Sequence, residues 1–185
     1  MTMTSITQKS RGKPPALQVT HMDEVAETIR GDALAQVREK LYPVERDLNP
    51  AALFRRPDFL GRFLFALATQ VARTLAAHDQ RVLAVYAFDP SANPPPEAGE
   101  EVLPDTMVHL LVLVTAPTAA LSTFIAALDR ALAASLRELT PLFAQRESIM
   151  DVALITETDV RLGLGLAGML SAVFAPPIKI WQREH

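Results

Sequence analysis

The feature that most constrains the fold of this 185-residue chain is a short apolar run at residues 107–116. The run is rich in Val and Leu, and its only polar side chains are those of His109 and Thr115. It opens after Pro104-Asp105 and closes at Pro117, so it has the length of a strand rather than of a buried helix. This pattern predicts a β-strand that is buried on both faces.

Three further segments have the pattern of strands. Residues 82–88 and 150–155 are apolar runs of strand length, and residues 178–182 alternate in the way that a short edge strand does. Together with the run at 107–116, they predict four strands. Buried central strands and a short alternating edge strand are typical of a sheet that is covered by helices.

The remaining segments have the 3.6-residue periodicity of helices packed on a core. Thr20 and Asp23 resemble a capping box before the first of them, while Gly31-Asp32 disfavours one continuous helix there. We therefore expect an α/β (α+β) fold, with a mixed sheet of about four strands, helices packed on it and N-terminal helices before it. The expected helices lie at about residues 21–41, 59–78, 121–139 and 156–174.

Length and composition suit one domain with a substantial core. We expect a flexible basic arm at residues 1–20 and a single α/β domain at residues 21–185, helical at 21–80. The net charge of −3 gives no strong nucleic-acid signal, and the absence of cysteine excludes disulfides and thiolate metal sites. No signal peptide is evident, and the most lipid-like segment, residues 162–175, is too short to cross a bilayer. These observations favour a cytoplasmic protein without a membrane segment.

Opposite charges are segregated along the chain. The N-terminal segment carries Lys9, Arg11 and Lys13 and no acid, which is typical of a flexible terminus or of a basic arm that docks on a partner or on RNA. The segment 89–105 carries five acids, five prolines and no base. A connection of this length and composition is typical of an extended, solvated loop.

Four residues at the ends of the expected strands carry a resemblance to a known family. Asp89 follows the first strand, Met107 and His109 begin the second, and Asp151 begins the third. The element order and these positions, over about residues 81–183, resemble the nucleotidyltransferase fold, the polymerase-beta-like superfamily. Members of that family carry Leu-Phe-Gly-Ser after the first strand, Asp-x-Asp at the second and a further aspartate on the third. The resemblance implies a phosphate-binding turn and three carboxylates that hold two Mg²⁺ ions.

This chain departs from the family pattern at the residues that carry the chemistry. Met107 and His109 stand in place of the two aspartates, and neither side chain suits Mg²⁺. Asp89-Pro90 stands in place of the Gly-Ser turn, where Pro90 has no backbone N–H for a phosphate and Asp89 would repel one. Only Asp151 matches a family carboxylate. We therefore expect no catalytic residues, no bound metal and no cofactor.

The remaining motifs indicate binding surfaces rather than chemistry. Gly163, Gly165 and Gly168 match the dinucleotide fingerprint G-x-G-x-x-G, but polar residues separate the motif from the preceding strand and too little chain follows it. We interpret these glycines as a notched helix face that a second backbone can approach. Among the histidines, which are His21, His78, His109 and His185, no two have the spacing of metal ligands.

His109 is the only histidine within an apolar strand. We expect it to be a buried, hydrogen-bonded residue, with a structural pairing to Asp151 as one arrangement that adjacent strands allow.

The sequence thus favours a non-catalytic, nucleotidyltransferase-like protein with a binding, regulatory or assembly role. The glycine motif and the basic residues Lys9, Arg11 and Lys13 are its candidate surfaces for a protein partner or for a second copy. Two alternatives remain open. One is an active nucleotidyltransferase or another nucleotide-binding enzyme, and the other is an unrelated α/β structural protein that assembles through its charged segments.

Overall fold

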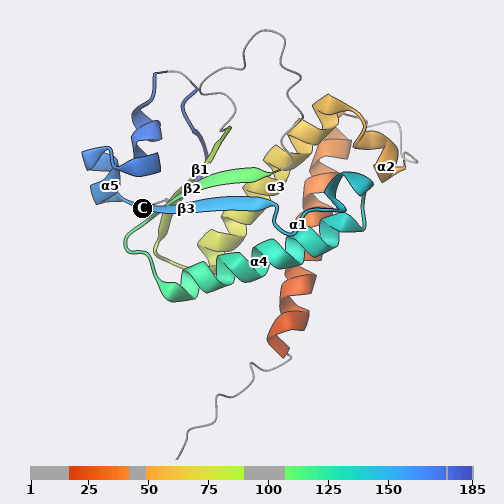
Figure 1. The fold of residues 1–185 in the computed structure, drawn as a ribbon, viewed down its shortest axis with the longest axis horizontal. Helices are drawn as coiled ribbons and strands as arrows, with labels where there is room; N and C mark the ends of the chain where they lie inside the picture. Colours follow the sequence, from red (N-terminus) through yellow and green to blue (C-terminus); the bar gives the residue numbers. More distant parts are fainter. Residues whose placement is uncertain (1–16, 42–48, 90–106, 174, 185) are drawn as a thin grey trace, which may run out of the picture.

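Four strands form one mixed sheet, which confirms the expected fold class. The computed structural model describes residues 17–41, 49–89, 107–173 and 175–184 (Figure 1). The sheet order is β3-β2-β1-β4; β2 pairs parallel with β3 and antiparallel with β1, and β4 pairs antiparallel with β1. The strands are β1 (Val82–Phe88), β2 (Val108–Val114), β3 (Met150–Thr156) and β4 (Ile178–Gln182).

The central position of β2 follows from its apolar run. Leu110, Leu111 and Val112 are all fully buried, so both faces of this strand are covered. Its backbone pairs with β3 along its whole length and with β1 from His109 to Val114. The run at 178–182 forms the edge strand that its alternation predicts.

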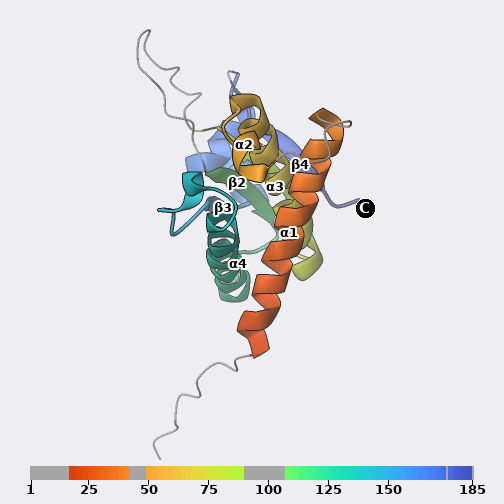
Figure 2. The same cartoon turned by 90° about the vertical axis from the view of Figure 1, so that its right-hand side faces the viewer.

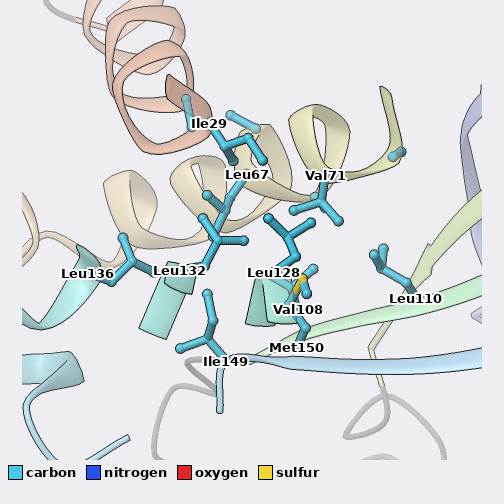
Figure 3. Close-up of a cluster of buried hydrophobic side chains, with 14 of the residues drawn as sticks. Ile29, Leu67, Val71, Val108, Leu110, Leu128, Leu132, Leu136, Ile149 and Met150 are labelled. Carbon is cyan, nitrogen blue, oxygen red and sulfur yellow. The ribbon is translucent and has the colours of Figure 1, made fainter. Parts of the chain in front are cut away.

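Three long helices cover one face of the sheet (Figures 1 and 2). In α3 and α4, the apolar stripe turns toward the strands, while α1 packs across both helices. Figure 3 shows Leu67 and Val71 of α3 on one side of this cluster, with Leu128 of α4 next to Val108 of β2. The helices on this side are α1 (Leu17–Leu41), the short α2 (Pro50–Leu53), α3 (Pro57–His78) and α4 (Ala119–Arg137), followed by the 3₁₀ turn η2 (Pro141–Phe143).

The opposite face carries a thinner layer, made of α5 (Glu157–Leu162) and the 3₁₀ helix η3 (Gly165–Ser171). Ala167 of η3 is fully buried against Leu111 and Ile155 of the sheet. This placement follows from the handedness of crossovers. The chain steps outward from β2 to β3 and then back across the sheet to β4, so the two connections keep the same hand only on opposite faces.

Two expectations about helices are wrong. The first helix begins at Leu17, before the anticipated capping box at Thr20, and it runs without a break through Gly31. Tertiary packing explains its continuity, because Ile29 and Ala33 are buried on either side of the glycine and hold both halves against the core. The basic arm therefore loses residues 17–20 to this helix, and its remainder, like the acidic loop at 90–106, lies outside the described residues.

The last helix is also shorter than its periodicity predicts. It ends at Leu162 rather than near residue 174, because Gly163 adopts a left-handed conformation with φ of 63° at its C-terminus. The chain then continues as η3. The anticipated start of this helix is confirmed, since Thr156 and Asp159 form a reciprocal capping box.

A helix side chain sets the start of β3. Asp129 of α4 accepts hydrogen bonds from the backbone N–H groups of Ile149 and Met150, both at 2.9 Å. Both of these residues are buried, so their N–H groups have little access to water. The carboxylate of Asp129 therefore fixes where β3 enters the sheet, and with it the position of Asp151.

We predict that Asp129→Ala lowers the free energy of unfolding by about 2–3 kcal/mol, because two buried N–H groups lose their acceptor. Asp129→Asn keeps an oxygen acceptor at the same place and should cost about 1 kcal/mol or less, reflecting only the loss of charge. Urea denaturation of the two variants measures the difference. Equal losses would show that the two hydrogen bonds are not what stabilises the entry of β3.

Candidate functional site

Two of the residues singled out by the sequence, His109 and Asp151, meet across adjacent strands. His109 of β2 and Asp151 of β3 are register partners, and Nδ1 of His109 lies 3.2 Å from Oδ2 of Asp151. A carboxylate accepts only, so the imidazole donates this hydrogen bond through Nδ1–H. The side chain of His109 is 11% exposed and that of Asp151 is 58% exposed, so the pair opens toward solvent on the carboxylate side.

The row continues onto β1. Phe88 is the register partner of His109 on its other side, and the two ring centroids lie 5.4 Å apart with a tilt of 52°. Since alternate residues of a strand share a face, these three side chains lie on the face opposite α3 and α4. The pairing of His109 with Asp151, one of the arrangements that the sequence allows, is the one present.

Met107 and Asp89 lie at the same end of the sheet. Met107 immediately precedes β2 and Asp89 immediately follows β1, and both line a pocket together with His109. Three of the four sequence-predicted positions therefore border one pocket, whereas Asp151 does not line it and contacts only His109 of these four residues.

The pocket has a volume of about 540 Å³, which lies within the usual range of small-molecule sites, about 300–1,000 Å³. It occupies the end of the sheet, between the first half of α3 and the segment that leads into β4. Most of its walls are apolar, and its described lining contains one carboxylate, one imidazole and no Lys or Arg. The lining residues are Gly61, Leu64, Phe65, Ala68, Ala87, Phe88, Asp89, Met107, Val108, His109, Ala175, Pro176 and Ile178.

The α3 wall was not predicted from the sequence. Phe65 lies off the apolar stripe of this helix and is 47% exposed, whereas the stripe residues Phe63 and Leu67 are fully buried. Gly61 stands one turn earlier, and a Cβ added there would meet no atom within 4 Å. An aromatic residue off the stripe beside an unconstrained helix glycine was the available signal for this wall.

The glycine motif lies elsewhere and is not a helix face. Gly163 and Gly165 are exposed and have φ of 63° and 52°, so they form a turn between α5 and η3. A Cβ at Gly168 would lie 3.1 Å from the carbonyl oxygen of Gly163, so this glycine permits the turn to close on itself. None of the three lines the pocket. Lys9, Arg11 and Lys13 lie outside the described residues.

Leucines around this turn form an exposed apolar strip. The exposed fractions of Leu162, Leu164 and Leu166 are 60%, 52% and 45%.

At the first turn of α5, hydrogen bonds from the hydroxyl and backbone N–H of Thr156 hold the pKa of Asp159 below its ordinary value. This capping box anchors the first turn of α5, and the strip begins at the last residue of that helix.

Two properties of the described ranges bear on other functions. They contain no group of three or more His, Cys, Asp or Glu side chains that could hold a metal ion. Within them, α4 alone is long and apolar enough to cross a bilayer by length and composition. Its buried residues, among them Leu121, Leu128 and Leu132, pack in the main core of this domain, as a central helix of a folded domain also does.

No family model, no curated protein and no solved structure matches this chain. The geometry of the pocket and of the exposed strip is therefore the basis for a functional proposal.

We predict that Gly61→Ala raises the free energy of unfolding by about 0.5–1 kcal/mol, because alanine restricts the unfolded chain and fits an open helix position. Gly31→Ala in α1 is the matched control, since a Cβ there also meets nothing within 4 Å and the residue lies outside the pocket. Urea denaturation should give similar gains for both variants. A loss of stability for Gly61→Ala but not for Gly31→Ala would show that a side chain at residue 61 clashes with its surroundings.

Proposed function

We propose that this chain is a non-catalytic binding protein on a nucleotidyltransferase-like sheet, and that the pocket beside His109 is its binding site. The observation that carries the proposal is the contact of 3.2 Å between His109 and Asp151. It lies where the resemblance would require carboxylates to face each other around Mg²⁺, and an imidazole that donates to a carboxylate offers no such oxygen cage.

The chemistry of the neighbouring residues supports binding over phosphoryl or nucleotidyl transfer. Two-metal catalysis needs oxygen ligands that clamp the attacking and leaving groups, and Met107 offers a thioether instead. Asp89 would repel a triphosphate, and the described lining supplies no Lys or Arg to offset it. A regulatory or assembly role, in the cytoplasm and without a cofactor, is consistent with these features.

The alternative of an active nucleotidyltransferase, or of another nucleotide-binding enzyme, differs in a measurable way. It requires metal-dependent affinity for nucleotides, with ligands that come from residues other than Met107 and His109. An unrelated α/β structural protein, the third alternative, would bind neither nucleotide nor small ligand and would differ from a monomer in solution mass.

We predict that the wild-type chain has no Mg²⁺-enhanced affinity for nucleoside triphosphates, whereas the double variant Met107→Asp/His109→Asp gains affinity for Mn²⁺. The two new carboxylates and that of Asp151 would then form a set of three at the family's spacing. Isothermal titration with nucleotides, with and without Mg²⁺, tests the wild type. Electron paramagnetic resonance of free Mn²⁺ measures the gain, which we expect to bring the dissociation constant below about 1 mM, near the weak end for carboxylate sites.

The control for this gain is the same double variant with Asp151→Ala, which should return Mn²⁺ binding to the wild-type level. Micromolar, Mg²⁺-dependent nucleotide binding by the wild type would overturn the non-catalytic proposal. A double variant that folds but binds no Mn²⁺ would show that residues 107, 109 and 151 do not correspond to the family's carboxylates.

A second candidate function, self-association, is favoured by the exposed strip of Leu162, Leu164 and Leu166. Three exposed leucines within five residues of chain leave apolar area that a partner or second copy would cover. The strip replaces the notched helix face as the proposed contact surface, with Gly163 and Gly165 shaping the turn that presents it.

We predict that Leu164→Ser/Leu166→Ser weakens self-association by roughly ten-fold or more, because two half-exposed leucines lose their apolar burial in the contact. The control is Leu142→Ser, because Leu142 is 40% exposed and belongs to η2, which packs against α4 on the other side of the sheet. Sedimentation equilibrium over a concentration series measures the effect. A wild-type chain that stays monomeric at all concentrations would contradict this function.

A further inference from the structure

We propose that the free edge of β3 takes an extended peptide segment of a partner protein, which pairs with it as a further strand of the sheet. The proposal goes beyond the pocket of the proposed function, since no residue of β3 lines that pocket. It rests on two properties of this edge: backbone groups that have no partner, and apolar side chains on both faces of the strand.

The backbone groups follow from the register of the parallel pair. β3 lies at one end of the sheet and pairs with β2 alone. The N–H of Val108 donates to the carbonyl oxygen of Ile149 at 2.8 Å, which fixes the phase of the ladder. In this phase, Ile149 and every second residue after it turn their backbone groups toward β2, whereas Val152 and Leu154 turn theirs outward. Within the described residues, no hydrogen bond reaches the outward groups of these two residues.

Side chains close the edge at both ends of this open stretch. At Met150, the N–H donates to Asp129 at 2.9 Å and the carbonyl oxygen accepts from the hydroxyl of Ser148 at 3.2 Å. At the last residue of the strand, the N–H of Thr156 donates to Asp159 at 2.8 Å. The open stretch between them is short, so it suits a short extended segment rather than a long strand.

The side chains beside the open groups are apolar on both faces. Val152 and Leu154 are half-buried and pack against the main core, while Ala153 is half-buried on the far face next to Ile155. β3 carries no Lys, Arg or Pro, which are residues that commonly protect an edge, whereas the other edge strand, β4, carries Lys179. An added segment would form main-chain hydrogen bonds to the edge, and its alternate side chains would cover apolar area on both faces.

The carboxylates at the ends of the stretch favour a peptide over a second copy of this chain. In an antiparallel pair of β3 strands that uses only the open groups, the start of one strand lies opposite the end of the other. The carboxylates of Asp129 and Asp159, which bond to those two ends, would then face each other across the seam. Their like charges oppose this pairing. A short peptide that carries no acid meets no such repulsion.

The first test is hydrogen exchange of the wild-type chain alone, followed by ¹H–¹⁵N NMR. The amide protons of Val152 and Leu154 should exchange about ten-fold or more faster than those of Ala153 and Ile155, because the latter two bond to β2. Equal protection of all four amides would show that the edge is already covered, and it would overturn the proposal.

The second test adds a peptide to the full chain. The probe is acetyl-Thr-Val-Thr-Val-Thr-amide with N-methyl groups on both valines, so that one edge keeps its N–H groups and the peptide cannot form sheets with itself. At millimolar concentration it should slow the exchange of Val152 and Leu154 and leave that of Ala153 unchanged. The control peptide is also N-methylated at its central threonine, which removes a donor from the pairing edge. We expect it to bind about ten-fold more weakly.

A variant of the strand locates the site. Val152→Pro deletes one outward N–H and keeps the ladder to β2, so it should weaken binding of the probe about five-fold. Val152→Thr is the matched control, since it keeps the N–H and the branched shape and should bind the probe as the wild type does. Thermal melts establish that both variants are folded. The comparison of the two peptides needs no variant, so it decides the question if Val152→Pro does not fold.

Three outcomes of the peptide experiment would overturn the proposal. They are no protection of Val152 and Leu154 by the probe, equal binding of the two peptides, and protection without peptide that rises with protein concentration. The last would identify a second copy as the occupant of the edge. The Mn²⁺ and nucleotide titrations test the non-catalytic proposal at other residues, so the two ideas fail through different measurements.

Discussion

The structure depends on the pairing of β2 on both of its sides. A strand buried on both faces has no water to satisfy its backbone, so each N–H and C=O group requires a neighbouring strand. The parallel β3 provides that pairing over the whole of Val108–Val114, and the antiparallel β1 provides it from His109 to Val114. Parallel pairing in turn requires a long crossover, which is α4, and the return to β4 requires a second crossover on the other face. The layers of the domain follow from this one strand.

The sheet could be predicted from the sequence because strand length and apolar content are local properties. The observed bounds of β1 and β4 are those of the runs at 82–88 and 178–182, and β3 extends its run by one residue. The two helix errors have a different cause, since both occur at a glycine, a residue that allows a helix either to continue or to end. At Gly31, neighbours buried in the core keep the helix continuous, whereas Gly163 turns left-handed and ends one. The same residue type gives opposite results, and periodicity alone cannot separate them.

Only the strand-end contact of the candidate site could be predicted from the sequence. A strand order and a register are sufficient to bring His109 beside Asp151, so this contact could be anticipated from the chain. The pocket that they border could not, because its opposite wall comes from Gly61 and Phe65 of α3, more than 40 residues earlier in the sequence. The side of α3 that faces the pocket lies next to its core stripe, and only the packing of the helix on the sheet distinguishes the two. The resemblance to a family concerns residues at the strand ends, so it could not predict a wall that α3 provides.

The carboxylate of Asp129 has a consequence for the whole sheet. A parallel strand has no tight turn to fix its register, and a slip of one residue would exchange the two faces of β3. Met150 would then leave the core, and Asp151 would enter it without a partner. Asp129 opposes this slip from the helical side, since its two hydrogen bonds specify which backbone N–H groups begin the strand. A substitution at Asp129 of α4 would therefore change the position of Asp151, and with it the pair that Asp151 forms with His109 on the far face.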